Sequence, residues 1–244
     1  MSIKMELSYP REVEEAKREC KPVLLPIGTM EWHSEHCPYG CDTLTAYGVA
    51  ERVAREVDAM ILPPVWYGVA SYAVGGPEKN TLNVDCDTME SYVYCILKSL
   101  FAAGFKKNIF ILIAHQTEDY MPMTLACMKA AKKLIMADLE ESGGYGWWGK
   151  NENADFYENL AAKDSPWNRI RIVKLPYTPS CKGFGDHAGV HESSMLEALY
   201  PGSIKLDRLS DDWFAATAKD MTIEHGEEIV YSCVKDIVNM IKGE

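Results

Sequence analysis

The sequence lacks a CxxC cysteine pair, an excess of basic residues and any long apolar run. Its 8 cysteines are scattered over 244 residues, which is weak support for a disulfide framework. Only 25 Lys and Arg face 36 Asp and Glu, and the net charge of -11 disfavours binding to phosphate backbones and anionic lipids. No segment approaches the roughly 20 apolar residues that cross a bilayer, and no signal peptide opens the chain. We therefore expect a reduced, cytoplasmic protein without a nucleic-acid or membrane partner.

The composition is that of an ordinary globular protein. Hydrophobic residues make up 47% and charged residues 25%, which leaves little room for extended disorder. A chain of this length commonly forms one α/β domain around one large core. We therefore predict a single domain over residues 1–244, without internal repeats.

Apolar runs alternate with segments of helical periodicity along most of the chain. The runs at 22–28, 59–68, 108–114 and 170–175 have the character of buried strands. Helices are predicted over 43–57, 87–103, 120–139, 191–199 and most of 211–241, with Asp42 and Asp87 in the N-cap positions of the first two. This alternation predicts a mainly parallel sheet covered on both faces, with ligands outside the carboxyl ends of the strands.

Residues 142–168 show no steady period, and we expect a loop excursion there. Gly144 to Gly149 matches GxGxxG, but no strand precedes it and its two tryptophans would obstruct a pyrophosphate, so nucleotide binding is not favoured. Trp147 and Trp148 have three interpretations: a lid that lines a substrate pocket, a subunit contact, or an apolar anchor beneath the loop.

Polar residues are concentrated directly after the first predicted strand. The loop Glu31-Trp32-His33-Ser34-Glu35-His36 is followed by Asp42. Carboxylate oxygens together with imidazole nitrogens suit Zn, Mn, Fe or Co, and one Asp carboxylate can bridge two ions. The alternative is a polar loop in which Asp42 only caps the next helix and the histidines satisfy backbone groups.

Two later segments favour the metal interpretation. His115 ends the most apolar strand, where an imidazole without a partner would be costly. Asp186-His187-Ala188-Gly189-Val190-His191-Glu192-Ser193-Ser194 adds a polar cluster at a loop-to-helix junction. The alternative for His115 is a hydrogen bond to a nearby carbonyl. The alternative for the second segment is an ordinary helix cap.

Several motifs occur in a fixed order: Gly28-Thr29-Met30-Glu31-Trp32-His33, then His36, Pro38, Gly40, Asp42-Thr43, His115, His187-Ala188-Gly189 and Glu192-Ser193-Ser194. In this order and spacing, from about Val23 to Pro201, they closely resemble the creatininase family. The resemblance implies a three-layer α/β/α sandwich and a homo-oligomer, a hexamer for which a trimer of dimers is one arrangement. It also implies hydrolysis of amide-type C–N bonds with two metal ions.

Carried over by position, the resemblance implies a ligand set and a catalytic group. Glu31, Asp42 and His115 would hold one divalent ion, while His33, Asp42 and Glu192 would hold the other. Zn, Mn and Fe all occur in the family, and His187 matches its catalytic histidine. The residues expected to bind substrate are Ser71, Gln116, Trp147, Trp148 and Asp186.

The chain departs from the family pattern near His115. Gln116-Thr117-Glu118 follows this histidine, and Thr117 stands where creatininase has a metal-site glutamate, which weakens the case for creatinine itself. Glu118 is a candidate catalytic base, or a group that recognises a cationic substrate, with a solvated loop carboxylate as the alternative. Ser34-Glu35 replaces a common Gly-Pro. Cys37 and Cys41 flank the metal loop and are expected to pack as small side chains rather than to bind zinc.

The predicted reaction is a dinuclear, metal-dependent hydrolysis of a small amide, formamide, cyclic amide or amidine. Metal coordination lowers the pKa of water from about 15.7 towards roughly 7, so a metal-bound hydroxide can attack at neutral pH. His187 would stabilise the tetrahedral oxyanion or carry a proton to the departing nitrogen. The alternatives are peptide-end trimming or another metal-assisted reaction on the same scaffold, and a non-catalytic metal-binding assembly subunit.

Overall fold

A computed structural model describes residues 3–115, 122–154, 165–181 and 183–243, and its centre is a five-stranded sheet in the order β1-β3-β2-β4-β5. The strands are β1 (Ile3–Lys4), β2 (Val23–Ile27), β3 (Met60–Ile61), β4 (Ile109–Ile113) and β5 (Ile170–Lys174). Each neighbouring pair is parallel. The carboxyl ends of β2 and β4, which pair in register over five residues, therefore lie at the same edge of the sheet.

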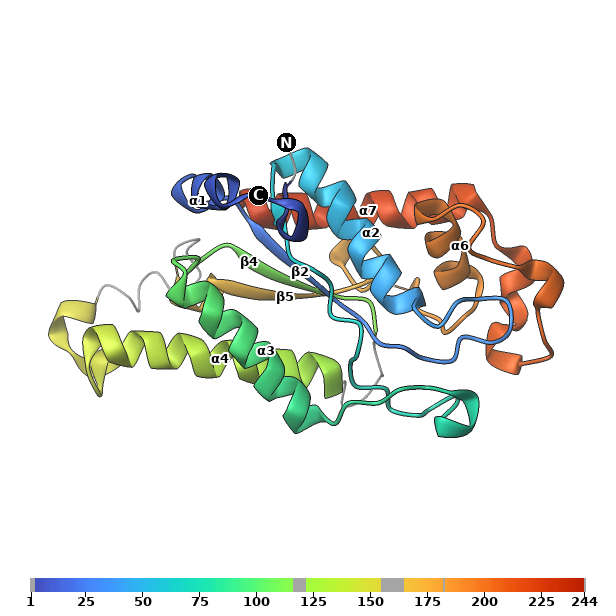
Figure 1. The fold of residues 1–244 in the computed structure, drawn as a ribbon, viewed down its shortest axis with the longest axis horizontal. Helices are drawn as coiled ribbons and strands as arrows, with labels where there is room; N and C mark the ends of the chain where they lie inside the picture. Colours follow the sequence, from blue (N-terminus) through green and yellow to red (C-terminus); the bar gives the residue numbers. More distant parts are fainter. Residues whose placement is uncertain (1–2, 116–121, 155–164, 182, 244) are drawn as a thin grey trace.

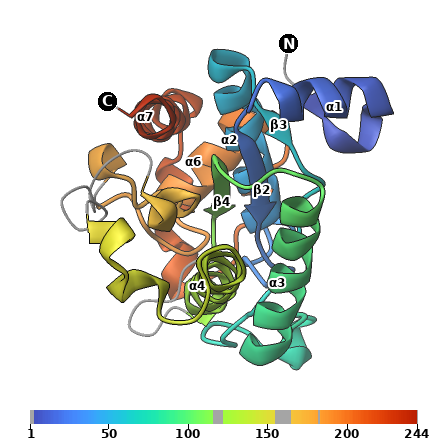
Figure 2. The ribbon, with the colours of Figure 1, turned by 90° about the vertical axis from the view of Figure 1, so that its left-hand side faces the viewer.

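Helices cover both faces of this sheet (Figure 1). On one face lie α3 (Cys86–Ala102) and α4 (Pro122–Gly143), and on the other lie α2 (Cys41–Val57), α6 (Val190–Leu199) and α7 (Ile223–Lys242). Figure 2 shows the strands between these two layers. The predicted three-layer α/β/α sandwich with a mainly parallel sheet is confirmed. Shorter helices complete the described chain: α1 (Pro10–Arg18), η1 (Met5–Leu7), η2 (Pro77–Lys79), η3 (Trp147–Gly149), η4 (Asn151–Asn153), η5 (Pro166–Asn168), η6 (Pro179–Cys181), η7 (Leu206–Arg208) and η8 (Trp213–Asp220).

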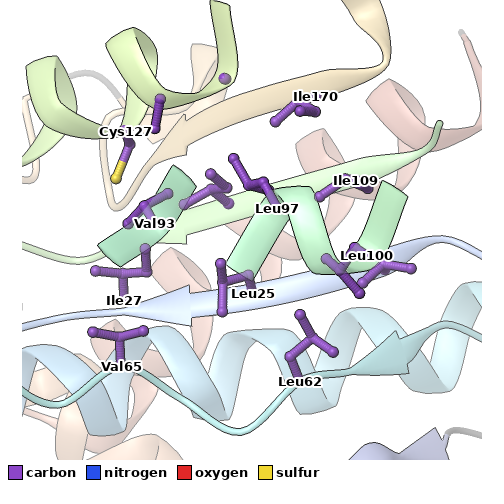
Figure 3. Packing of buried hydrophobic residues seen from close by; sticks show 14 of the residues in the cluster. Leu25, Ile27, Leu62, Val65, Val93, Leu97, Leu100, Ile109, Cys127 and Ile170 are labelled. Atoms are coloured by element: carbon purple, nitrogen blue, oxygen red, sulfur yellow. The ribbon is translucent and has the colours of Figure 1, made fainter. Parts of the chain in front are cut away.

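The strands divide the core into two clusters because successive side chains point to opposite faces of a sheet. Leu25 and Ile27 of β2 pack with α3 and α4, and Figure 3 shows this cluster. Leu24 of the same strand packs with α2 and α7 on the other face. Both faces of β2 and β4 are fully buried, which explains the continuous apolar runs that form them in the sequence.

Two predicted helix caps are wrong. Asp85, and not Asp87, caps α3, because the Asp85 side chain accepts a hydrogen bond from the Thr88 backbone N–H. Asp42 does not cap α2: the N-cap is Gly40, and Asp42 lies inside the first helical turn with its carboxylate buried. The carboxylate of Asp42 is therefore available for a different role.

Two elements were not predicted from the sequence. β1 and α1 precede the first predicted strand, and α1 begins with Pro10 in its first turn, with the Glu12 side chain accepting the Tyr9 N–H. These are helix-start signals that the sequence analysis overlooked. Among the described helices, none combines the length and apolar character needed to span a bilayer.

Candidate metal centre

Four segments deliver polar side chains to the edge where β2 and β4 end. Glu31 and His33 lie in the loop after β2, and His115 follows β4 by two residues. Asp42 comes from the first turn of α2, and Glu192 from the first turn of α6. The sheet order and the helix starts thus bring together residues that are up to 161 positions apart in the sequence, as the carboxyl edge of a parallel sheet favours.

The ring nitrogens of two histidines face the carboxylates at short range. His33 Nε2 lies 3.1 Å from Asp42 Oδ1 and 3.4 Å from Glu192 Oε2. His115 Nδ1 lies 3.0 Å from Asp42 Oδ2 and 3.2 Å from Glu31 Oε2. Asp42 therefore stands between the two histidines and presents one oxygen to each.

These contacts do not satisfy the polar atoms by hydrogen bonding. His33 Nε2 and Asp42 Oδ2 are buried and have no hydrogen-bond partner in the part of the chain that the structure describes. Two ligand atoms about 2.1 Å from one ion are about 3.0 to 3.4 Å apart in ordinary coordination angles. The spacing thus matches atoms that converge on shared ions, and the mixed nitrogen and oxygen donors suit a divalent transition metal.

Three groups of three ligands can be drawn among the described residues, and one of them joins Glu31 and His33 to His187. Glu31, Asp42 and His115 offer ligand atoms within 4.8 Å of one another, and so do His33, Cys41 and Glu192. Cys41 is the weaker donor, because a hydrogen bond with Cys37 and burial raise the pKa of its thiol well above the ordinary value. Asp42 Oδ1 is the better third ligand beside His33 and Glu192, because it is an anionic oxygen 3.1 Å from His33 Nε2.

The carboxylates dominate the electrostatics of the cluster. Burial alone would lower the pKa of His115, but hydrogen bonding and charge from Asp42 and Glu31 raise it to about 10. Burial likewise opposes the charge of His33, yet Glu192 and Asp42 raise its pKa well above the ordinary value. The cluster thus attracts positive charge strongly enough to overcome desolvation, as a cation site requires.

One hydrogen bond sets the orientation of His33. Its Nδ1 lies 3.0 Å from the Glu31 carbonyl oxygen, which can only accept, so Nδ1 carries the proton. Nε2 then points at Asp42 and Glu192, where it can bind a cation in place of its own proton. Metal-ligating histidines are usually oriented by a hydrogen bond of this kind from the other ring nitrogen.

His187 lies against the cluster, with a ring nitrogen within 4.8 Å of ligand atoms of Glu31 and His33. Its Nε2 donates to the Trp32 carbonyl oxygen at 2.9 Å, which leaves Nδ1 as the acceptor. The ring stacks on His33 with centroids 4.4 Å apart and contacts Phe214 at 5.3 Å. Burial and the neighbouring His33 lower the pKa of His187, so its imidazole is neutral at pH 7 and able to accept a proton.

Asp186 holds the start of α6 in place. Its Oδ1 accepts the Glu192 N–H at 3.0 Å, and its Oδ2 accepts the His191 N–H at 2.9 Å. Glu192 Oε2 in turn accepts the Ala188 N–H at 2.7 Å. Both oxygens of Asp186 are thus engaged by backbone, and burial followed by the charge of Glu192 raises its pKa to about 6.

A small cavity of about 50 Å³ adjoins these residues. Asp42, His115, His187 and Glu192 line it together with Tyr177, and the other lining residues are Ala114, Leu175, Pro176, Gly185 and Asp186. The sequence analysis missed Tyr177 and Phe214. Tyr177 lies in no motif or periodic segment, and Phe214 lies in the predicted helical segment 211–241, whose periodicity indicates a helix and not a site.

Comparison with known proteins agrees with this geometry. The family model described as creatinine amidohydrolase matches residues 6–231. The chain belongs to the creatininase family. This membership confirms the resemblance seen in the sequence and makes the chain a member of a hydrolase family.

Two curated relatives extend the comparison. Creatinine amidohydrolase of Pseudomonas putida is 25% identical over 249 residues, which cover 91% of this chain and 89% of the relative. The 3-dehydro-scyllo-inosose hydrolase of Thermotoga maritima is 28% identical over 116 residues, 47% of this chain and 36% of the relative.

Solved creatininase structures share the fold. The structure named creatininase Mn superposes with a TM-score of 0.75 at 21% identity and covers 100% of this chain and 98% of that one. A Zn-Zn form and a form complexed with creatine, both variants, each have a TM-score of 0.74 at 21% identity and the same coverage. At this identity the likeness shows a common creatininase fold.

Of the remaining predicted site residues, some lie outside the described residues and the tryptophans lie apart from the cluster. Gln116 and Glu118 belong to the segment that is not described. Trp147 is buried at the carboxyl-terminal end of α4, and in Figure 1 that yellow segment lies at the opposite end of α4 from α6. The Oγ of Ser71 is buried without a hydrogen-bond partner among the residues that the structure describes. A substrate-binding role for Trp147, Trp148 and Ser71 stays a prediction.

Proposed function

We propose that this creatininase-family chain is a dinuclear metal-dependent amidohydrolase that cleaves a C–N bond of a small amide, formamide, cyclic amide or amidine. The observation that carries the proposal is the position of Asp42. Its two oxygens face His33 on one side and His115 on the other, at 3.1 and 3.0 Å. A carboxylate shared in this way is suited to bridge two cations.

The ligand assignment follows from the same distances. Glu31, Asp42 and His115 are proposed to hold the first ion, and His33, Asp42 and Glu192 the second. When bound, the two ions supply Lewis acidity and a nucleophile formed from water near neutral pH. The protein keeps its donors in place: His33 through the Glu31 carbonyl, and Glu192 through the Ala188 N–H.

His187 is proposed as the proton carrier. Its neutral ring keeps Nδ1 as the proton-accepting nitrogen and lines the cavity beside Asp42 and Glu192. A base of this kind can accept a proton as the substrate is attacked and return it to the departing nitrogen. The Trp32 carbonyl and the ring of Phe214 hold the imidazole in one orientation, which keeps Nδ1 as the nitrogen that exchanges the proton.

Relatives support the class of metal and of substrate. Solved creatininase structures named for manganese and for a Zn-Zn form support Mn and Zn as the ions, with Fe kept as the third alternative. A creatininase complexed with creatine and a creatinine amidohydrolase relative support a small nitrogen compound as substrate. A metal-dependent hydrolase of C–N bonds outside ordinary peptide linkages is the enzyme class that this family membership supports.

A second reaction on the same scaffold has specific support. The relative that hydrolyses 3-dehydro-scyllo-inosose aligns with nearly half of this chain, so a cyclic substrate other than an amide is the alternative. The predicted homo-oligomer, a hexamer arranged as a trimer of dimers, also stays a prediction. Sedimentation of the purified protein tests it.

Asp42→Asn tests the shared carboxylate. The asparagine keeps the size of the side chain but replaces one oxygen with an amide nitrogen, which cannot bind a cation. We expect loss of amine or ammonia release from cyclic ureas, formamides and guanidino compounds, and lower occupancy of both ions in metal analysis.

Asp85→Asn is the matched control, because Asp85 is an exposed helix cap and asparagine caps as well as aspartate. Activity and metal content should stay at the wild-type level in this variant. If Asp42→Asn loses one ion and keeps full turnover, the shared carboxylate is refuted.

A further inference from the structure

Two cysteines outside the metal centre lie in direct contact. Cys181 in η6 and Cys233 in α7 have sulfur atoms 3.3 Å apart, and both side chains are fully buried. Both are free thiols. A disulfide has a sulfur–sulfur distance of about 2.05 Å, so a shift of little more than 1 Å along the line between the atoms would join them.

The surrounding contacts fix the two thiols relative to each other. Ser180, the neighbour of Cys181, donates from its N–H and from its hydroxyl to the two oxygens of Asp236 on α7, each at 2.7 Å. The Thr178 hydroxyl lies 4.0 Å from the Cys233 sulfur. The turn that carries Cys181 is therefore already bound to α7 at two residues just before the thiol.

The two thiols differ in acidity. A hydrogen bond from Cys233 lowers the pKa of Cys181 to about 7, in spite of burial, whereas the same interaction and burial raise the pKa of Cys233 far above its ordinary value. At neutral pH a substantial share of Cys181 is thiolate, the nucleophilic form, and Cys233 keeps its proton. The pair thus contains one attacking and one resolving thiol.

We propose that Cys181 and Cys233 are a redox site that hydrogen peroxide converts into a disulfide. In the first step the Cys181 thiolate attacks the peroxide, its sulfur gains one oxygen as a sulfenic acid, and hydroxide leaves and takes up a proton as water. In the second step the Cys233 sulfur attacks that sulfenic acid, the S–S bond forms, and a second water departs. Two thiols are oxidised by two electrons and one peroxide is reduced to two waters.

The position of the pair connects it to the metal centre. Cys181 belongs to the segment between β5 and α6, which also supplies Tyr177 and His187 to the cavity. Pro179 and Ser180 above it are exposed, so one surface turn separates the thiols from solvent. The disulfide would fasten this segment covalently to α7, at a point the metal ligands do not touch.

The test treats the purified full-length protein with hydrogen peroxide and maps linked peptides by mass spectrometry. We expect a Cys181–Cys233 linked peptide, a mass lower by two hydrogens, and full reversal by a dithiol reductant. The thermal midpoint should rise on oxidation and return on reduction, because the link restricts the unfolded chain. Oxidation of the exposed Cys20 and Cys95 without a Cys181–Cys233 link would overturn the proposal.

Two serine variants separate the roles of the thiols. In Cys233→Ser, peroxide should stop at the sulfenic acid of Cys181, which dimedone traps as an adduct on that residue. In Cys181→Ser, Cys233 should give no adduct. An adduct on Cys233, or equal adducts in both variants, would overturn the assignment. Because none of these readouts measures hydrolysis, the result stands apart from the fate of the proposed metal chemistry.

Discussion

Gly226 lies in the first turn of α7, at its closest approach to α6, and its replacement by alanine gives a test of how this contact supports the fold. A Cβ at this position would lie 1.9 Å from the Ser194 carbonyl oxygen and 2.4 Å from the Ser194 carbonyl carbon. Ordinary contact begins at 3.4 Å. The two helices would therefore have to separate by about 1.5 Å, because a backbone carbonyl within a helix cannot rotate away.

The sign of the effect follows from two opposing terms. Alanine favours a helix interior over glycine by about 1 kcal/mol. Overpacking costs about 1 to 3 kcal/mol, and the upper end applies here because the obstacle is a backbone carbonyl. We therefore expect Gly226→Ala to lower the free energy of unfolding by about 2 kcal/mol, which for a chain of this size lowers the thermal midpoint by about 4 to 8 °C.

Thermal unfolding followed by circular dichroism measures this shift. Gly149→Ala is the matched control, since a Cβ there has no atom within 4 Å, and its midpoint should stay within about 1 to 2 °C of wild type. Ser194 lies two residues after Glu192, so Gly226→Ala should also weaken metal binding. A Gly226→Ala protein at least as stable as wild type would refute the packing argument.

Three further predictions concern the metal centre and an ion-pair network. His187→Gln should lower turnover about a hundredfold or more with metal content unchanged, which metal analysis beside a rate assay checks. Removal of metal with a chelator should abolish hydrolysis and lower the thermal midpoint, and added Mn or Zn should restore both. Burial raises the pKa of Asp138, but Lys106 and Arg169 outweigh it and lower that pKa. The carboxylate therefore stabilises the fold above the unfolded pKa of about 3.9 and loses this effect as the pH falls through the lower folded value. Asp138→Asn should cost about 1 kcal/mol in urea unfolding at pH 7 and less near pH 2; an equal cost at both pH values would contradict the ion-pair explanation.

The two fully buried strands of the sheet could be predicted from the sequence. β2 and β4 are continuous apolar runs bounded by breakers, and each was predicted within one or two residues. Helix starts were harder. Asp85, Asp87 and Asp42 all have the side chain of a good cap, and only the three-dimensional surroundings decide which carboxylate bonds to a backbone N–H and which turns inward.

The candidate site was predicted in part, because only some of its residues have a recognisable position in the sequence. Glu31 and His115 follow apolar strands, and the end of an apolar strand can be recognised in a single sequence. Tyr177 and Phe214 reach the site only through tertiary packing, Phe214 by resting against His187. Asp186 was expected to bind substrate, and this role stays a prediction: it lines the cavity, and both of its oxygens accept hydrogen bonds from the start of α6. The residue type alone could not show that Asp186 bonds to the backbone of α6.

Ser34 shows how a departure from the family pattern is accommodated. It takes the place of a glycine common in the family and adopts a φ of 62°, which costs a non-glycine residue about 1 kcal/mol. Its hydroxyl donates to Asp212 Oδ2 at 2.8 Å, and Ser210 donates to the same oxygen at 2.6 Å. A hydrogen bond to a charged group contributes about 1.5 to 3 kcal/mol, which offsets the strain. The bond also ties the loop of His33 to the residues just before Phe214. The side chain that replaces glycine therefore couples the metal-binding loop to the aromatic ring that holds His187.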